Sequence, residues 1–222
     1  MELNADFTKR AVIHGSRIPW LPSPIRGVER RMLDRIGDEV ARATTIVRYA
    51  PGSHFSAHTH GGGEEFLVLA GVFTDEDGDF PTGSYVRNPP TSRHTPGSAS
   101  GCTILVKLWQ FDPEDRKQIR LKTEELPFVP VPERPGVEIK PLFQDTRETV
   151  QLERWAPATT VRLPSPGGLE LFVLRGGFTE GNETFEPYSW LRIPDGAALD
   201  AETGPAGCTL WMKSGHLREA RP

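Results

Sequence analysis

The chain has 222 residues, a formal net charge of −4 and two cysteines. This length allows one or two domains, and mild acidity without a basic stripe argues against nucleic acid as a direct partner. No apolar run approaches the roughly 18 residues of a membrane span, the first ten residues lack the apolar core of a secretion signal, and two distant cysteines make no disulfide scaffold. We therefore expect a cytoplasmic protein without a membrane partner.

Short strands are predicted along most of the chain. Glycine and proline are abundant without a period, which is typical of many strands joined by turns. Residues 43–49, 65–69 and 103–109 are β-branched or apolar and each suits a strand. The acidic run Asp75–Asp79 predicts a polar hairpin turn, which we favour over a calcium-binding loop. This pattern favours an all-β barrel or jelly roll.

Helices are expected only as short pieces, around residues 23–33 and 112–118. The charged, proline-rich stretch from Asp112 to Val131 is interpreted as a connection between two parts of the chain.

The second half of the sequence repeats segments of the first half. Residues Arg48–Pro51 return as Arg154–Pro157, and the strand Glu65–Phe73 returns as Glu170–Phe178. Further echoes follow in the same order, for example Gly101–Thr103 as Gly207–Thr209. Repetition in a constant order indicates duplication. We therefore predict two domains, residues 1–112 and 113–222.

Between Gly52 and His94 the first copy carries a candidate metal site. His58 and His60 are two residues apart, so on a strand their side chains share one face. Three glycines then let the chain reverse and deliver Glu64 into the next strand, and His94 ends a later one. Three imidazoles and a carboxylate are suitable ligands for a divalent transition metal. Surface histidines on a glycine-rich loop are the alternative.

The spacing of these residues resembles the signature of the cupin superfamily. The matching positions are Gly52, His58, His60, Glu64, Gly71, Gly83, Pro89 and His94. Two positions depart from it: Thr91 replaces a glycine and Ser98 replaces an asparagine, and neither is a ligand position. The resemblance implies two tandem cupin (jelly-roll) barrels.

Within the cupins, the first copy is most similar to the C-terminal domain of ChrR-type anti-sigma factors. The matching segments include Phe55–His60, Gly62–Leu69, Arg87–Pro90 and Gly101–Lys107. In that family a separate helical zinc domain binds a sigma factor and the cupin senses stress. The resemblance therefore implies a regulatory, stress-sensing metal-binding protein. It does not extend to the sigma-binding domain, since the chain has no Cys-x-x-Cys motif, and a sigma-factor partner is an expectation from the family alone.

The second copy lacks the candidate ligands. Leu163 replaces His58, Ser165 replaces His60, Leu169 replaces Glu64 and Leu199 replaces His94. Leucine cannot bind a cation of this kind. We expect the second barrel to be apolar and free of metal.

Three charged residues occur in both copies, so they are not tied to the metal. Glu65, Arg87 and Lys107 return as Glu170, Arg192 and Lys213, which favours a structural pairing across strands over catalysis. Cys102 and Cys208 also correspond and are interpreted as small buried side chains.

The remaining histidines are not assigned to the metal. His54 shares parity with His58 and His60, which leaves open an extra ligand, an orienting partner or a place at the barrel mouth. His14 and His216 are expected to be solvated.

The metal and its use stay open at this level. Zinc is our first choice, with iron, manganese or nickel as alternatives, because imidazole suits them all. A closed zinc site would suit sensing, whereas iron or manganese with open positions would suit a dioxygenase acting on a small diketone or hydroxyketone. A third alternative is a small-molecule-binding protein whose metal is structural. A small-molecule ligand in the first barrel and a homodimer are compatible with each.

Overall fold

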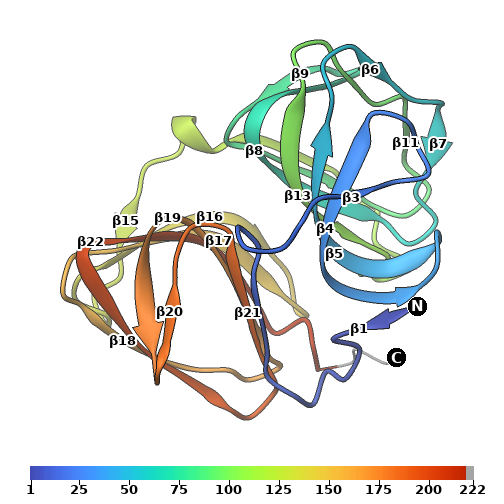
Figure 1. Cartoon of the computed structure of the whole chain (residues 1–222). Coiled ribbons are helices and arrows are strands. Elements are labelled where there is room, and N and C mark those ends of the chain that lie inside the picture. Colours follow the sequence, from blue (N-terminus) through green and yellow to red (C-terminus); the bar gives the residue numbers. More distant parts are fainter. Residues whose placement is uncertain (219–222) are drawn as a thin grey trace. The chain divides into compact units, whose positions relative to one another are not determined.

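The computed structural model describes residues 1–218, which form two compact β units (Figure 1). Unit 1 consists of Met1–Ala5 and Pro19–Glu125, and unit 2 consists of Asp6–Ile18 and the chain from Leu126 onward. The one helix among the described residues is the short 3-10 turn η1 (Thr123–Glu125), and none is long and apolar enough to cross a membrane. The all-β prediction is confirmed.

Unit 1 is built on an antiparallel sheet in the order β1-β4-β5-β13-β8-β10-β14, with four short strands beside this path and a separate pair, β7 with β11. The strands are β1 (Glu2–Leu3), β3 (Leu21–Pro22), β4 (Val28–Gly37), β5 (Ala41–Tyr49), β6 (Ser53–His54), β7 (His58–Thr59), β8 (Glu64–Asp75), β9 (Gly78–Pro81), β10 (Ser84–Asn88), β11 (Arg93–His94), β12 (Gly97–Ser98), β13 (Cys102–Leu108) and β14 (Ile119–Lys122).

Unit 2 repeats this arrangement in the order β15-β16-β17-β22-β19-β21-β2, with β18 and β20 beside the path. Its strands are β2 (Ala11–His14), β15 (Val129–Pro130), β16 (Val137–Gln144), β17 (Thr149–Trp155), β18 (Thr160–Pro164), β19 (Leu169–Glu180), β20 (Glu183–Phe185), β21 (Ser189–Ile193) and β22 (Ala198–Ser214). The duplication read from the sequence is therefore a duplication of the jelly-roll fold.

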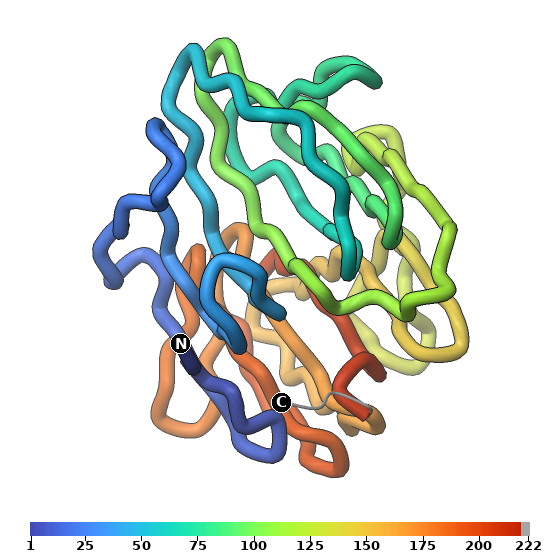
Figure 2. Tube along the Cα trace, turned by 90° about the vertical axis from the view of Figure 1, so that its right-hand side faces the viewer, coloured from blue at the N-terminus to red at the C-terminus, as the bar shows by residue number. Residues whose placement is uncertain are grey.

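The two copies exchange an edge strand. β2, from the start of the chain, pairs with β21 of unit 2 (Figure 2), and β14, which follows the first copy, pairs with β10 of unit 1. Each compact unit therefore consists of two separate stretches of the chain, so no single boundary divides the units. The boundary after residue 112 stays a prediction about the duplicated sequence.

A buried arginine anchors each exchanged segment. Arg87 in β10 lies over the ring of Phe111 at 4.1 Å and pairs with Asp115 at 2.6 Å. Arg192 in β21 lies over the ring of Phe7 at 4.3 Å and donates to a backbone carbonyl of the same segment at 3.0 Å. This matching role explains why both arginines persist whether or not the copy keeps the histidines. The structural interpretation of these charges fits the observed register, in which Arg87 and Lys107 flank Glu65.

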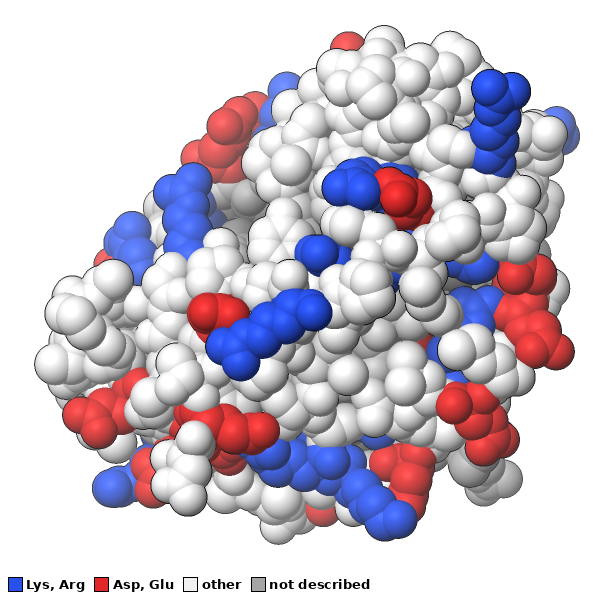
Figure 3. Space-filling view, in the orientation of Figure 1, with Lys and Arg blue, Asp and Glu red and all other residues white. Residues whose placement is uncertain are grey.

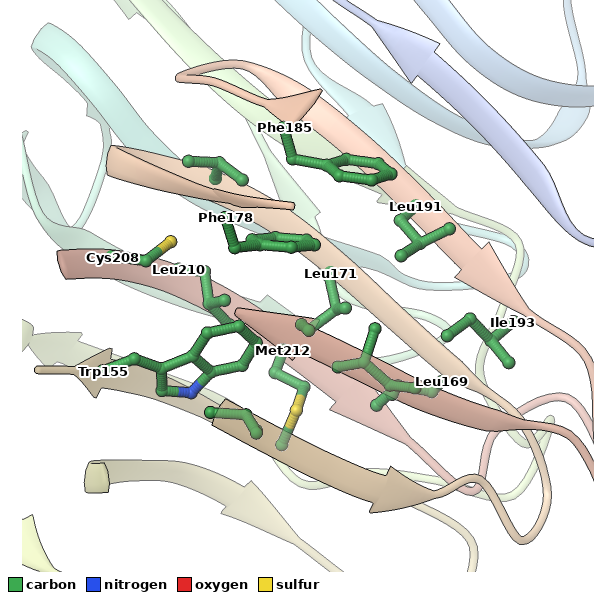
Figure 4. Packing of buried hydrophobic residues seen from close by; sticks show 14 of the residues in the cluster. Trp155, Leu169, Leu171, Phe178, Phe185, Leu191, Ile193, Cys208, Leu210 and Met212 are labelled. Atoms are coloured by element: carbon green, nitrogen blue, oxygen red, sulfur yellow. The ribbon is translucent and has the colours of Figure 1, made fainter. Parts of the chain in front are cut away.

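The interior of unit 2 is filled with apolar side chains (Figure 4). Phe178 and Phe185 stack with centroids 4.6 Å apart, and Trp155 packs against Phe178 at 5.4 Å. In unit 1 the corresponding cluster contains Phe66 and Phe73, whose rings are 4.7 Å apart.

Neither predicted helix forms. Between Leu21 and Leu33 the chain makes a β3–β4 hairpin, because Gly27 takes a left-handed backbone angle (φ 80°) and Ser23 N bonds Val28 O. From residue 112 to 118 the Asp112 and Asp115 carboxylates each accept a hydrogen bond from a backbone N–H two residues on, which favours turns over a helix. The expected connection also contains β14, η1 and β15.

The hairpin prediction at Asp75–Asp79 is confirmed by the pairing of Asp75 with Gly78 at the β8–β9 turn.

On the face shown in Figure 3, acidic and basic side chains are interspersed. Exposed pairs such as Arg17–Glu186 (2.9 Å) contribute little stability individually. This face presents no continuous patch of one sign.

Thr91 lies in the β10–β11 loop at φ 76°, an angle that a β-branched residue rarely adopts. Its backbone N–H bonds the carbonyl of His60 at 2.9 Å, and its side chain is exposed. Strain of about 1–3 kcal/mol exceeds the entropic cost of glycine, about 0.5–1 kcal/mol. We expect Thr91→Gly to stabilise unit 1 by about 1 kcal/mol in urea unfolding. Thr59→Gly, an exposed strand position without that angle, should destabilise it. A lower midpoint for Thr91→Gly would contradict the strain argument.

Candidate metal centre

Three of the four candidate ligands lie on strands of unit 1, and the fourth, His60, directly follows β7. His58 in β7 is directly opposite His94 in β11. His60 follows His58 by two residues and lies one residue past the end of β7. Glu64 is the first residue of β8, reached through the turn Gly61–Gly63.

The side chains of His58, His60, Glu64 and His94 converge on one point. One potential ligand atom from each lies within 4.8 Å of the other three. The imidazole rings stand nearly perpendicular, with centroids 4.6 Å apart for His60 and His94 and 5.1 Å apart for His58 and His60. The predicted cluster of residues is thus brought together by the fold.

Hydrogen bonds determine which nitrogen of each ring carries the proton. The Ser92 hydroxyl donates to Pro89 O at 2.6 Å, so it accepts from His60 Nδ1 at 3.0 Å. His94 Nδ1 lies 3.2 Å from the carboxylate of Asp75, which only accepts when ionised.

His58 completes the same pattern, because its Nδ1 lies 3.2 Å from the carbonyl of Ser56. All three Nδ1 atoms therefore carry the hydrogen, and all three Nε2 atoms present a lone pair. Metal-binding histidines are usually oriented by such an outer hydrogen bond.

Two of these Nε2 atoms are buried without a hydrogen-bond partner among the described residues. They belong to His60 and His94, and lie 3.3 Å and 3.5 Å from Glu64 Oε2. Unpaired buried nitrogens are costly, and lone pairs facing a carboxylate repel it. A divalent cation between them would satisfy all three groups, so the residues present fit a metal ion.

The Glu64 carboxylate is held by a second row of polar groups. Asn88 lies opposite Glu64 on β10 and donates to its Oε2 at 3.2 Å. Gln118, just before the exchanged strand β14, donates in turn to the Asn88 carbonyl at 3.2 Å. The exchanged segment therefore contributes to the position of a candidate ligand.

Burial and neighbouring charges move the pKa values of two ligands in opposite directions. Burial lowers the pKa of His60, and Glu64 offsets this only in part. For His94, burial also acts to lower the pKa, but the Asp75 hydrogen bond and the Glu64 charge outweigh it, so the pKa is raised. The neutral imidazole that a metal requires is thus favoured at His60, while His94 is held by its carboxylate partner.

Asp75 is the residue that sequence reasoning missed. It ends β8 at the turn to β9, and its place in the acidic run Asp75–Asp79 predicted only a hairpin turn. Its second oxygen accepts from Asp77 N at 2.8 Å, which holds the carboxylate toward His94. The eighteen intervening residues gave no local signal for this contact.

Gly61, Gly62 and Gly63 make the turn and also leave room for the aromatic rings that pack against them. A Cβ on Gly62 would lie 2.4 Å from the Trp109 indole, and one on Gly63 would lie 2.4 Å from the Phe111 ring. Of the three, only Gly63 has a positive φ (77°). The other two are required because Trp109 lies against them.

A cavity of about 630 Å³ adjoins the four ligands, all of which line it. Its other walls are mainly apolar, with Val47 and Val106 among them, and Trp109 also lines it with 48% of its surface exposed. Tyr49 presents a phenol there, and burial, followed by the charge of Glu64, raises its pKa.

The second copy places its replacements at equivalent positions. Leu163 pairs with Leu199 as His58 pairs with His94. Leu169 and Leu199 are buried in the apolar cluster with Leu163 packed against it. The Ser165 hydroxyl lies 2.8 Å from the carbonyl of Ala197. No second cluster of metal-ligating residues occurs in the described part of unit 2.

The other histidines lie outside the cluster. His54 lines the same cavity and is exposed. The expectation that His14 and His216 are solvated is wrong. His216 is buried against Glu170, with Nε2 2.5 Å from its carboxylate, and His14 is half-buried, with Nδ1 3.0 Å from Ser189 Oγ. Both histidines complete buried polar groups of unit 2, which the flanking sequence did not reveal.

Cys102 and Cys208 are free and buried, as expected. Burial raises the pKa of the Cys102 thiol to about 11 and that of Cys208 to about 12.

Comparison with known proteins agrees with this fold. The family model of the ChrR cupin-like domain matches twice, over residues 8–112 and 116–218. No curated protein matches the chain.

Several solved structures share the fold at low identity. A "putative dioxygenase" from Nostoc punctiforme has 16% identity and a TM-score of 0.73, with 99% of this chain and 84% of that one covered. Ylba from E. coli has 13% identity and a TM-score of 0.72, with coverage of 98% and 95%. The oxalate decarboxylase of Lactobacillus farciminis, in a formate complex, has 10% identity and a TM-score of 0.64, with coverage of 92% and 86%.

Loss of one candidate ligand should abolish tight metal binding. Loss of a residue that hydrogen-bonds a metal ligand typically lowers metal affinity about 10–100-fold. We expect His94→Ala, which removes a ligand itself, to lower metal affinity by more than this. Metal content after dialysis and calorimetric titration measure this. His54→Ala is the matched control, since it removes a histidine of the same cavity outside the cluster. Equal metal content in both variants would refute the ligand assignment.

Asp75→Asn should weaken metal binding by about 10–100-fold, because the amide keeps the shape but removes the charge that orients His94. Asp79→Asn changes an exposed carboxylate of the same hairpin and should have no effect on affinity. The same titration compares the two, and an unchanged affinity for Asp75→Asn would show that His94 needs no such partner.

Proposed function

The chain belongs to the ChrR cupin-like family in two copies, and on this basis we propose that unit 1 is a metal-dependent small-molecule-binding centre used for sensing. The observation that carries the proposal is the pair of bare, buried Nε2 atoms facing Glu64 at the wall of the cavity. A transition metal held by the three imidazoles and Glu64 would supply an electrophilic site for an oxygen-bearing ligand. The regulatory part of the proposal is supported by the family match alone.

A purely structural metal is less well supported. Structural sites are normally closed by protein on all sides. Here His58 is exposed, and the ligands border a space large enough for a small molecule. That cavity is also the observation that favours our second candidate, a metal-dependent dioxygenase.

In this proposal unit 2 binds no metal. Leucines fill the positions of three ligands, so its interior contributes packing in place of coordination.

The first test is metal content of protein purified without added metal, followed by thermal unfolding with and without metal. We expect about one ion per chain. A free ion at 100 times its dissociation constant should stabilise the fold by about 2.7 kcal/mol. Replacing His60 with alanine should remove both effects. Full stability without metal and no bound ion would refute the proposal.

The second test separates sensing from turnover. The zinc, iron and manganese forms of the protein are mixed with small diketones and hydroxyketones. Ligand binding and oxygen uptake are measured in the same samples. Binding without uptake supports sensing. Uptake that depends on iron or manganese and is lost in Glu64→Gln supports the dioxygenase.

A further inference from the structure

Tyr49 lines the mainly apolar wall of the cavity beside the candidate ligands. Tyr49 ends β5 and packs its ring edgewise on Phe55 at 5.1 Å and near Phe73 at 5.9 Å. Its hydroxyl takes part in none of the hydrogen bonds among residues 1–218. A phenol held by its ring with an unused donor is suited to hydrogen-bond a ligand.

The second copy provides an internal comparison for this position. Tyr49 pairs with Cys102 as Trp155 pairs with Cys208. The Trp155 Nε1 donates to Glu153 at 2.6 Å, so its polar atom is satisfied within the unit. The residue at the place of Glu153 in the first copy is Val47, which offers no acceptor. The unused donor is therefore specific to the unit that carries the histidine cluster.

Charge limits what the cavity can hold. A divalent ion and the Glu64 carboxylate leave one positive charge on the coordinating groups, and the Asp75 carboxylate, 3.2 Å from His94 Nδ1, reduces the positive charge of the site further. Arg30 is the one Lys or Arg among the lining residues, and it lies 3.5 Å from Glu39, which lines the cavity too. A second negative charge on a ligand would be buried without a partner, which is costly.

An aromatic side chain at the cavity edge is placed to cover an apolar ligand. Trp109 is held in a left-handed backbone conformation (φ 58°) by its N–H bond to Gly63 O at 3.1 Å. Its indole rests on Gly61 and Gly62 yet stays 48% exposed. Strained residues that keep an exposed aromatic ring beside a site are often functional.

We propose that this cavity binds a small, mainly apolar molecule with one anionic oxygen group, such as a monocarboxylate or an enolate. The anionic oxygen faces the metal cluster and accepts a hydrogen bond from the Tyr49 hydroxyl. The apolar body of the molecule packs against Trp109. This inference rests on the proposed metal centre and specifies its ligand. Tyr49 is assigned a specificity-determining role, and Trp109 a role in binding the apolar body.

The test uses the full chain loaded with Co²⁺, whose visible spectrum reports on its ligands. Phenylacetate is the probe, phenylacetamide the neutral control and malonate the dianionic control. We expect phenylacetate to change the spectrum and to bind at least tenfold more tightly than either control, with no such preference in the metal-free protein.

Variants then assign the two side chains. Tyr49→Phe should weaken phenylacetate binding about tenfold, the size expected for a hydrogen bond to a charged group, while Co²⁺ affinity is unchanged. Tyr188→Phe, in unit 2, should leave binding unaltered. Trp109→Ala should weaken phenylacetate binding but leave acetate binding unchanged.

Gly62→Ala tests the packing of the Trp109 indole against the glycine turn without removing the indole. The added Cβ would overlap the indole, so we expect weaker phenylacetate binding, as in Trp109→Ala. Gly204→Ala, where a Cβ meets nothing within 4 Å, is the matched glycine control.

The outcomes distinguish the two levels of the proposal. If Co²⁺ does not bind, the metal centre itself is refuted, and the ligand assignment with it. If Co²⁺ binds but phenylacetate shows no preference over its controls, the metal centre stands and the ligand class is wrong. If Tyr49→Phe binds phenylacetate as tightly as the unmodified protein, the role of Tyr49 is refuted.

Discussion

The arrangement of unit 1 depends on three hydrogen bonds at the outer nitrogens of three histidines. Each Nδ1 lies within hydrogen-bond reach of an oxygen of Ser56, Ser92 or Asp75, so each Nε2 points inward with a free lone pair. Without these bonds the rings could rotate or take the other tautomer, and the four groups would not present one coordination site. The site is therefore set by the residues around the ligands as much as by the ligands. Those residues come from three separate loops and turns.

The duplication shows how one fold accommodates two interiors. Both units share strand order and register, including the pairing that places His58 beside His94 and Leu163 beside Leu199. In one unit these positions hold polar side chains that converge, and in the other they hold leucines that belong to or pack against an apolar cluster. The jelly roll tolerates both because its hydrogen-bonded ladder does not depend on which side chains point inward. Function here belongs to the site and not to the fold.

The exchanged strands also affect the position of a candidate metal ligand. β14 and β2 each complete the other sheet, and Arg87 and Arg192 bind the segments that lead to them. In unit 1 that segment also carries Gln118, which holds Asn88 and through it Glu64. The position of a candidate metal ligand is thus supported by residues that lie after the first copy of the repeat.

The sequence alone determined the all-β class and the duplication, and it grouped His58, His60 and Glu64 because strand parity and the glycine turn are local properties. His94 joined them only through the spacing that resembles the cupin signature. The sequence also indicated that the second copy lacks these ligands, since leucine cannot coordinate a cation. Only the tertiary structure decided that β2 and β14 change units, that His216 is buried on Glu170, and that Asp75 orients His94. These features are contacts between residues far apart in the chain, and such contacts depend on how sheets close in three dimensions, which no local pattern encodes.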